Sequence, residues 1–321
     1  MVTAIRPAKG SRVRPLLAFL GILLGLYAAA VVLAEATVAR GGAESPFQKL
    51  LAARGDAVDW VVVGASHALP LAYGEVPAWL EADTGQTMMV LAEVASGPLY
   101  NLFVADQAIR DLKLRHILYI VDAFAFADAA WNEARLSDRA LLRRTPLRLS
   151  TAASLARLTA AYGADPRGLA DYLTGFSKLN PPDRFPQEGW RGAQDFDRRF
   201  RPSRHAVTSR AAYLYPEGPP DAATVERYLD VLEALLDRAM AADIEVHLVR
   251  LPIPDVMRDA LPEEAEFDRA LKDRLAARGA VFHDLGAVLG EPGLYFDTDH
   301  LNRQGVDALY RDHLLAILRN D

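Results

Sequence analysis

The sequence contains no cysteine. Disulfide bonds, thiolate metal sites and a cysteine nucleophile are therefore excluded. The 321 residues also include no basic block, because the arginines are interleaved with acidic residues and the net charge is −6. Without a continuous basic surface we expect no nucleic acid among the partners. Gly-x-Gly-x-x-Gly and phosphate-loop motifs are absent too, so we expect no nucleotide and no other cofactor.

One long apolar run stands near the N-terminus. Residues 15–34 read PLLAFLGILLGLYAAAVVLA and carry no charge. At 1.5 Å per residue, about 20 helical residues span the roughly 30 Å hydrocarbon core of a membrane. Basic side chains gather in residues 1–14, whereas Glu35 follows the run. The positive-inside rule therefore predicts a cytoplasmic tail over 1–14, a single-pass anchor in a bacterial inner membrane, and a periplasmic domain.

Two other interpretations of this run remain open. Ala34-Glu35-Ala36 loosely resembles the small-x-small site of a cleavable signal peptide, although the run exceeds the usual 7–15 residues of a signal core. A buried core helix is the third interpretation. The anchor and the signal peptide both imply export of the domain. We expect the anchor, followed by a juxtamembrane segment over 35–56.

Residues 57–321 alternate between strand and helix patterns. The run Asp59-Trp-Val-Val-Val63 is typical of a strand buried on both faces of a parallel sheet. Further strands are expected over 87–91, 115–121, 244–250 and 280–284. Helices are expected over 46–53, 76–84, 99–113, 222–242, 264–278 and 302–318. This rhythm predicts right-handed βαβ units, and so an α/β fold with a parallel sheet between two helical layers.

A segment over about 125–215 interrupts that rhythm. It carries many arginines, several prolines and scattered aromatic residues such as Trp131 and Trp190. Long segments of this kind inside a domain are often functional. We interpret it as an insertion that forms a lid or a substrate wall. A helical cap without a specific role is the equal alternative.

A serine stands where the first strand of the domain ends. Gly64-Ala65-Ser66 follows the buried run directly, and doubly wound folds bind ligands at the carboxyl ends of their strands. A serine on such a tight turn is suited to act as a nucleophile. The motif alone is a weak signal, because many such serines only cap the following helix.

A second motif lies near the other end of the chain. Asp297 precedes His300 by three residues, just before the last expected helix. This spacing lets the carboxylate reach Nδ1 of the imidazole and leaves Nε2 free to face Ser66. Asp-x-x-His is also a common chance pattern. Its position together with Ser66 predicts serine-dependent acyl chemistry, with a nucleophile, a base and an orienting acid.

Taken together, these motifs resemble the SGNH (GDSL-like) hydrolase superfamily. The likeness covers about residues 57–124 and 222–318, and its most specific block is Asp297-Thr-Asp-His-Leu-Asn-Arg-Gln-Gly305. It implies a flavodoxin-like three-layer fold. It also implies Ser66 as nucleophile, His300 as base and Asp297 as the acid that orients it. The backbone N–H groups of Ser66 and Gly97 would form part of an oxyanion hole.

The chain departs from that superfamily in two places. The usual Gly-Asp-Ser reads Gly64-Ala65-Ser66, and the usual Gly-x-Asn-Asp after the third strand is replaced by Ile120-Val-Asp-Ala-Phe124. The loss of one oxyanion donor lowers a rate by about 10²–10³-fold. This loss resembles the membrane-anchored branch that includes the teichoic-acid D-alanylation accessory protein and the alginate acetylation proteins. That likeness implies a membrane-bound acyltransferase as partner.

Three further residues are candidates for substrate binding. His67 could donate to an oxyanion, bind a substrate carboxylate or simply line the cleft. Asp122 ends a strand at the cleft, where a ligand role and a capping role are both open. Asp299 could compete with Asp297 for His300, although a residue rarely orients its neighbour's ring. Asn302 is expected to cap the last helix.

Metal binding has little support in the sequence. The residues His283 and Asp284 end the fifth strand and could in principle join the expected site. No His-x-His or His-Glu-x-x-His spacing is present, so we expect no metal. The remaining histidines show no pattern, and a surface or core role is expected for His116, His205, His247 and His313.

The sequence therefore predicts an extracytoplasmic serine-dependent O-acyl esterase or O-acyltransferase acting on a cell-envelope glycan or a related acylated substrate. Which of the two it is depends only on the acceptor that reaches the acyl-enzyme. The alternative is a catalytically weak SGNH-like accessory domain that binds glycan or a membrane-bound acyltransferase.

Overall fold

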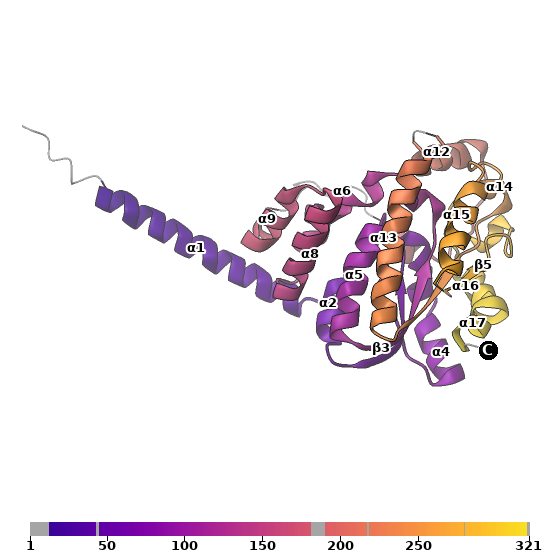
Figure 1. Ribbon diagram of the computed structural model, residues 1–321, viewed down its shortest axis with the longest axis horizontal. Helices are drawn as coiled ribbons and strands as arrows, with labels where there is room; N and C mark the ends of the chain where they lie inside the picture. The colour runs from indigo at the N-terminus through magenta and orange to yellow at the C-terminus, as the bar shows by residue number, and fades with distance from the viewer. Residues whose placement is uncertain (1–12, 43–44, 181–189, 217, 279, 320–321) are drawn as a thin grey trace, which may run out of the picture.

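The computed structural model describes residues 13–42, 45–180, 190–216, 218–278 and 280–319. Apart from its last two residues, the predicted cytoplasmic tail lies outside this part of the chain. Helix α1 (Val13–Arg40) contains the whole predicted membrane segment and buries none of its side chains. It extends away from the folded domain (Figure 1). Its length and apolar character suffice to cross a membrane, a property shared by anchors and signal sequences.

A short helix connects α1 to the domain. Helix α2 (Pro46–Ala52) begins after Ser45, whose hydroxyl accepts a hydrogen bond from the N–H of Gln48. The Gln48 side chain in turn accepts from the Ser45 N–H at 3.1 Å, which completes a capping box. The sequence prediction for this helix is thus confirmed within one residue.

The centre of the domain is a five-stranded parallel sheet with the order β2-β1-β3-β4-β5. This is the doubly wound order found in flavodoxin-like folds, and it confirms the predicted α/β class with a parallel sheet. Each predicted strand is present, with bounds that differ by one or two residues. The strands are β1 (Ala57–Val63), β2 (Met88–Val90), β3 (Lys113–Ile120), β4 (Glu245–Arg250) and β5 (Val281–Asp284).

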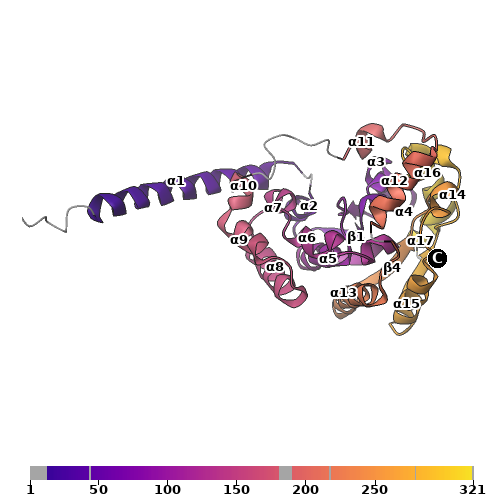
Figure 2. The same ribbon diagram turned by 90° about the horizontal axis from the view of Figure 1, so that it is seen from above.

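Helices cover both faces of the sheet (Figures 1 and 2). On one face, side chains such as Val61 and Ile117 pack against the helices α5 (Pro98–Asp111), α13 (Ala222–Ala241) and α15 (Ala265–Ala276). On the other, Val62 and Leu118 pack against α3 (Pro70–Tyr73), α4 (Val76–Thr84), α16 (Arg303–Leu309) and α17 (Leu315–Arg319). Successive residues of a strand point to opposite faces, so one apolar run supplies both cores.

The C-terminal helix begins as predicted but is not uniform. Asn302 accepts a hydrogen bond from the N–H of Gly305 at 3.0 Å and so caps α16. The chain then continues through a π-helical segment, Tyr310–Leu314, into α17. The prediction of one helix to about Leu318 did not include this local widening.

In its described part, the insertion over about 125–215 is mainly helical. It comprises α6 (Glu133–Leu136), α7 (Arg139–Arg143), α8 (Leu149–Tyr162), α9 (Pro166–Thr174), α10 (Phe176–Leu179), α11 (Gly192–Asp195) and α12 (Arg204–Leu214). The insertion reaches in two directions. The end of α9 contacts α1, where the Tyr27 hydroxyl donates to the Thr174 carbonyl at 3.1 Å, whereas α12 lies over the carboxyl ends of the strands (Figure 1).

Candidate active site

Ser66 lies directly beyond the carboxyl end of β1. It opens a 3₁₀ turn, Ser66–Ala68, and is 7% exposed. Gly64 makes this tight exit possible, because a Cβ at that position would lie 2.8 Å from Cβ of Ile120. Any side chain there would push β1 away from β3. The serine therefore stands at the edge of the sheet where doubly wound folds bind ligands.

A closed loop presents His300. The bridge between Tyr295 and Leu301 ties its two ends together, and the Phe296 N–H donates to the His300 carbonyl at 3.0 Å. Within the loop, Oδ1 of Asp297 accepts from the N–H of His300 at 2.9 Å. The short Asp-x-x-His spacing thus fixes the backbone of the histidine as well as its ring.

These segments bring Ser66, His300 and Asp297 into one hydrogen-bonded chain. Nε2 of His300 lies 2.9 Å from Oγ of Ser66. Nδ1 of His300 lies 2.9 and 3.0 Å from the two carboxylate oxygens of Asp297. This is the order that activates a serine, in which the acid holds the base and the base accepts the hydroxyl proton.

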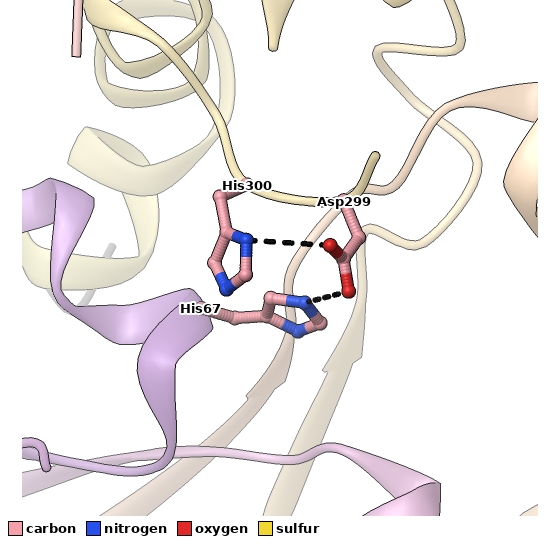
Figure 3. A group of neighbouring side chains, drawn as sticks. All are labelled: His67, Asp299 and His300. Carbon is pink, nitrogen blue, oxygen red and sulfur yellow. Dashed lines mark hydrogen bonds and ion pairs between the residues drawn. The ribbon is translucent and has the colours of Figure 1, made fainter. Parts of the chain in front are cut away.

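Asp299 forms a second contact with the same imidazole. Its Oδ1 lies 3.3 Å from Nδ1 of His300, farther than either oxygen of Asp297. Asp297 therefore has the better geometry for orienting the ring, as the sequence predicted. The other oxygen of Asp299 lies 3.1 Å from Nε2 of His67, so this buried carboxylate lies between two histidines (Figure 3).

His67 is held between two carboxylates. Its Nδ1 lies 2.6 Å from Asp122, opposite its contact with Asp299. Burial opposes the charged imidazole, but the Asp122 carboxylate, and then Asp299, raise the pKa of His67 to about 10. Both ring nitrogens then donate, so His67 is a fixed positive charge at neutral pH. Neither nitrogen is free to bind a substrate carboxylate or an oxyanion.

Arg210 of the insertion completes this charge network. Its Nε donates to Oδ2 of Asp299 at 2.8 Å. Burial alone would raise the pKa of Asp299, but His300, His67 and Arg210 hold it well below its usual range. Asp299 thus stays ionised at neutral pH and serves as the common counter-charge of the site.

The same charges act on the base. Burial would lower the pKa of His300, yet the carboxylates of Asp299 and Asp297 raise it above its ordinary value. A general base must be neutral before it accepts a proton. The site therefore requires a higher pH for activity than an isolated histidine would.

Sequence reasoning missed two residues that complete the site. Trp190 packs edge-on against the His300 ring with centroids 4.6 Å apart, and its N–H donates to the Tyr73 hydroxyl at 2.8 Å. Arg210 was likewise not identified. Both lie in the segment 125–215 that the sequence could describe only as a lid, a wall or a cap. An isolated tryptophan or arginine in this segment does not indicate a site residue, and their contacts with His300 and Asp299 are visible only in the structure.

The structure corrects the predicted role of Gly97. Its N–H donates to the Trp131 carbonyl at 2.7 Å and is therefore not available to an oxyanion. A Cβ at this position would lie 2.6 Å from Oδ1 of Asn132, which itself accepts from the N–H of Leu99. The glycine is thus needed for close packing at the start of α5.

Ser66 remains as a candidate oxyanion donor. Among the hydrogen bonds formed by the described residues, none uses its backbone N–H. The position after β3 supplies no donor, because the Asp122 carboxylate contacts His67 there. Of the two expected oxyanion donors, the N–H of Ser66 therefore remains a candidate, whereas the N–H of Gly97 is occupied.

A cavity of about 510 Å³ adjoins the network. His67, Asp122 and Asp299 are among its lining residues, together with acidic residues such as Glu263. Oδ2 of Asp122 is buried and has no hydrogen-bond partner among the described residues. This oxygen offers an unused acceptor to a hydroxyl or amine group bound in the cavity.

The site also contains a set of metal-ligand types. Single atoms of His67, Asp299 and His300 lie within 4.8 Å of one another (Figure 3). The Arg210 guanidinium already neutralises Asp299, and Nε2 of His300 contacts Ser66. A cation would have to displace both interactions, so these residues fit proton transfer better than metal binding.

No protein-family model and no curated protein matches the chain. The likeness to the SGNH superfamily therefore rests on the quoted motifs alone, and membership stays a prediction.

Proposed function

We propose that this protein is a membrane-anchored, extracytoplasmic O-acyl esterase or O-acyltransferase of the SGNH type. The observation that carries the proposal is the hydrogen-bonded chain from Ser66 through His300 to Asp297. Neutral His300 accepts the Ser66 proton as Oγ attacks an acyl carbonyl. Asp297 holds the ring in the required tautomer and stabilises the imidazolium that forms.

The reaction divides into two acyl transfers. In the first, the Oγ–carbonyl bond forms, the ester C–O bond breaks, and His300 returns its proton to the leaving alkoxide. In the second, His300 removes a proton from the acceptor hydroxyl, whose oxygen attacks the acyl-serine. The acyl–Oγ bond then breaks, and His300 returns the proton to Oγ of Ser66. Water as acceptor makes the protein an esterase, and a sugar hydroxyl makes it a transferase.

The cavity beside the site supports a substrate of moderate size. Its volume of about 510 Å³ lies within the usual range of ligand pockets, roughly 300–1,000 Å³. Asp122 lines the cavity, and its unused Oδ2 suits a hydroxyl group of a sugar. We therefore favour an acylated glycan of the cell envelope, close to the membrane that holds α1.

Contacts between α1 and the insertion favour a permanent anchor over a cleaved signal peptide. Lys178 is buried, with 1% of its side chain exposed, and pairs with Glu35 at 3.0 Å. The Tyr27 hydroxyl binds the Thr174 carbonyl. Cleavage at Ala36 would remove Glu35 and leave a buried ammonium group without its partner, which is strongly destabilising. These contacts support the proposal that α1 is retained and packs against the folded domain.

A second candidate function is an accessory domain with weak or no catalysis. The occupied N–H of Gly97 favours it, since of the two expected oxyanion donors the Ser66 N–H is the one left without a partner among the described residues. Two leucines of the insertion, Leu149 and Leu173, are 91% and 51% exposed and lie in helices near α1. Such side chains could contact a membrane-bound acyltransferase.

Labelling with a fluorophosphonate probe tests the proposal. The full-length protein in detergent should be used, because α1 contacts the insertion. We expect labelling of the parent protein, and its loss in Ser66→Ala and in His300→Ala. The exposed His205, in α12, provides the control His205→Ala, which should label like the parent.

The outcomes separate the two candidate functions. A folded parent that takes no label would reject the enzyme proposal and leave the accessory domain. If the parent reacts with the probe, a second assay uses an oligosaccharide with an isotopically labelled acyl group to distinguish the acceptors. Release of free acid identifies an esterase, and transfer to a second oligosaccharide identifies a transferase.

A further inference from the structure

A group of histidines lies on one face of the sheet, away from the serine site. His116 belongs to the first half of β3, and the register pairs it with Glu245, the first residue of β4. His247 follows two positions later in β4, so it points to the same face. Asp122 and Ser66, in contrast, follow the last residues of their strands. The histidines therefore lie within the strands, before the carboxyl ends where Ser66 and Asp122 stand.

The side chains meet at distances that suit a common cation. Nδ1 of His116 lies 3.3 Å from Oε2 of Glu245, and Nε2 of His247 lies 3.9 Å from the same oxygen. One ligand atom from each of the three residues lies within 4.8 Å of the others. A tetrahedral zinc ion with bonds of about 2.0–2.1 Å needs separations of about 3.3 Å, so small rotations suffice.

An independent observation also indicates a bound cation. Nδ1 of His247 and Nε2 of His283 are buried and form no hydrogen bond with the described residues. Only 10% of the His247 side chain is exposed. Buried polar atoms without a partner are rare in folded proteins and indicate a bound ion or water.

The surroundings keep these imidazoles in place. The Trp60 ring stacks on His116 with centroids 4.4 Å apart and contacts His247 edge-on. Glu245, with 63% of its side chain exposed, leaves the group open to solvent on one side.

We propose that His116, Glu245 and His247 bind one divalent transition-metal cation such as Zn²⁺. Two imidazoles and one carboxylate are a ligand set that zinc commonly takes, with water in the fourth position. His283 stacks on His247, with ring centroids 5.8 Å apart, and supports its orientation. The ion would link β3 to β4 and stabilise the sheet.

Calorimetric titration with ZnCl₂ tests this site. The full-length protein in detergent, without a polyhistidine tag, is first freed of metal by chelation. We expect one Zn²⁺ to bind per chain and the thermal unfolding midpoint to rise with it. Loss of a ligand should weaken binding at least about 100-fold, as in His247→Ala and His116→Ala. The exposed His205 again provides the control His205→Ala, which should bind as the parent does.

The remaining variants keep the test decisive. Glu245→Gln alters an exposed side chain, so it remains informative if His247→Ala does not fold. His300→Ala separates this site from the serine site and should retain binding. No saturable binding by the folded parent would overturn the proposal. Binding that survives in Glu245→Gln and His247→Ala but is lost in His300→Ala would do so as well.

Discussion

Asp299 lies beside His300 in the sequence and also contacts its imidazole, with Oδ1 3.3 Å from Nδ1. Two carboxylates thus share one ring nitrogen, because Asp297 contacts it at 2.9 Å. They differ in surroundings: 39% of the Asp297 side chain is exposed, against 1% for Asp299. From this difference we expect separate roles, in which Asp297 orients the His300 ring and Asp299 sets its charge balance.

Asp297→Asn is expected to reduce kcat by about 10³–10⁴-fold, because the amide no longer holds His300 in the tautomer that accepts the Ser66 proton. Hydrolysis of a simple ester measures the effect. Asp307→Asn is the matched control, since Asp307 forms a surface ion pair with Arg311. Full activity of Asp297→Asn would show that Asp299 orients the ring instead.

Asp299→Asn is expected to shift the acid limb of the kcat/KM profile to lower pH. In the parent, the carboxylates raise the pKa of His300, so the limb lies above the ordinary histidine value of about 6.5. Removing the negative charge of Asp299 lowers the pKa of His300. Neutral His300 is then present at lower pH. The limb is measured from pH 5 to 9. If the acid limb does not move, Asp299 does not influence the pKa of His300.

His67→Ala is expected to destabilise the fold by about 3 kcal/mol, because two buried carboxylates, Asp122 and Asp299, lose their shared partner. The charged histidine has a pKa of about 10 in the folded state and about 6.5 when unfolded. Its stabilisation is therefore complete below about pH 6.5 and is lost as the pH rises through 10. Urea unfolding from pH 6 to 11 measures this loss in the parent. If His67→Ala loses the same stability over this pH range, the titrating group is not His67.

The contact between α1 and the insertion predicts that the mature protein keeps α1. Intact mass spectrometry of protein extracted from membranes should show a chain that includes Glu35. Glu35→Ala should expose the insertion to protease, because Lys178 is then buried without a partner. Glu291→Ala is a control on a surface glutamate. A mature chain that begins near residue 37 would instead establish a signal peptide.

Gly97→Ala is expected to destabilise the fold by about 1–3 kcal/mol, because the new Cβ would lie 2.6 Å from Asn132. Gly293→Ala is the matched control, since nothing lies within 4 Å of a Cβ there. Its effect should stay within about 0.5 kcal/mol. Urea unfolding midpoints compare the two. Equal midpoints would mean that α5 can move to admit the methyl group.

Features that depend on local spacing could be predicted from the amino-acid sequence. An uncharged run of about 20 residues forms one helix, and a buried β-branched run forms β1 with Ser66 directly after it. A separation of three positions between Asp297 and His300 suffices to close their contact. Each of these follows from periodicity or from bonds within a few residues, which propensity and geometry fix without help from the rest of the chain.

The charge balance of the site and the second histidine group could not be predicted in this way, because both depend on contacts between distant segments. His67 lies between carboxylates 55 and 232 residues away in the chain. The N–H of Gly97 is occupied by a carbonyl of the insertion, and His116 meets His247 through strand register alone. Such contacts depend on how distant segments pack, and that packing is set by the cooperative burial of two cores rather than by any local pattern.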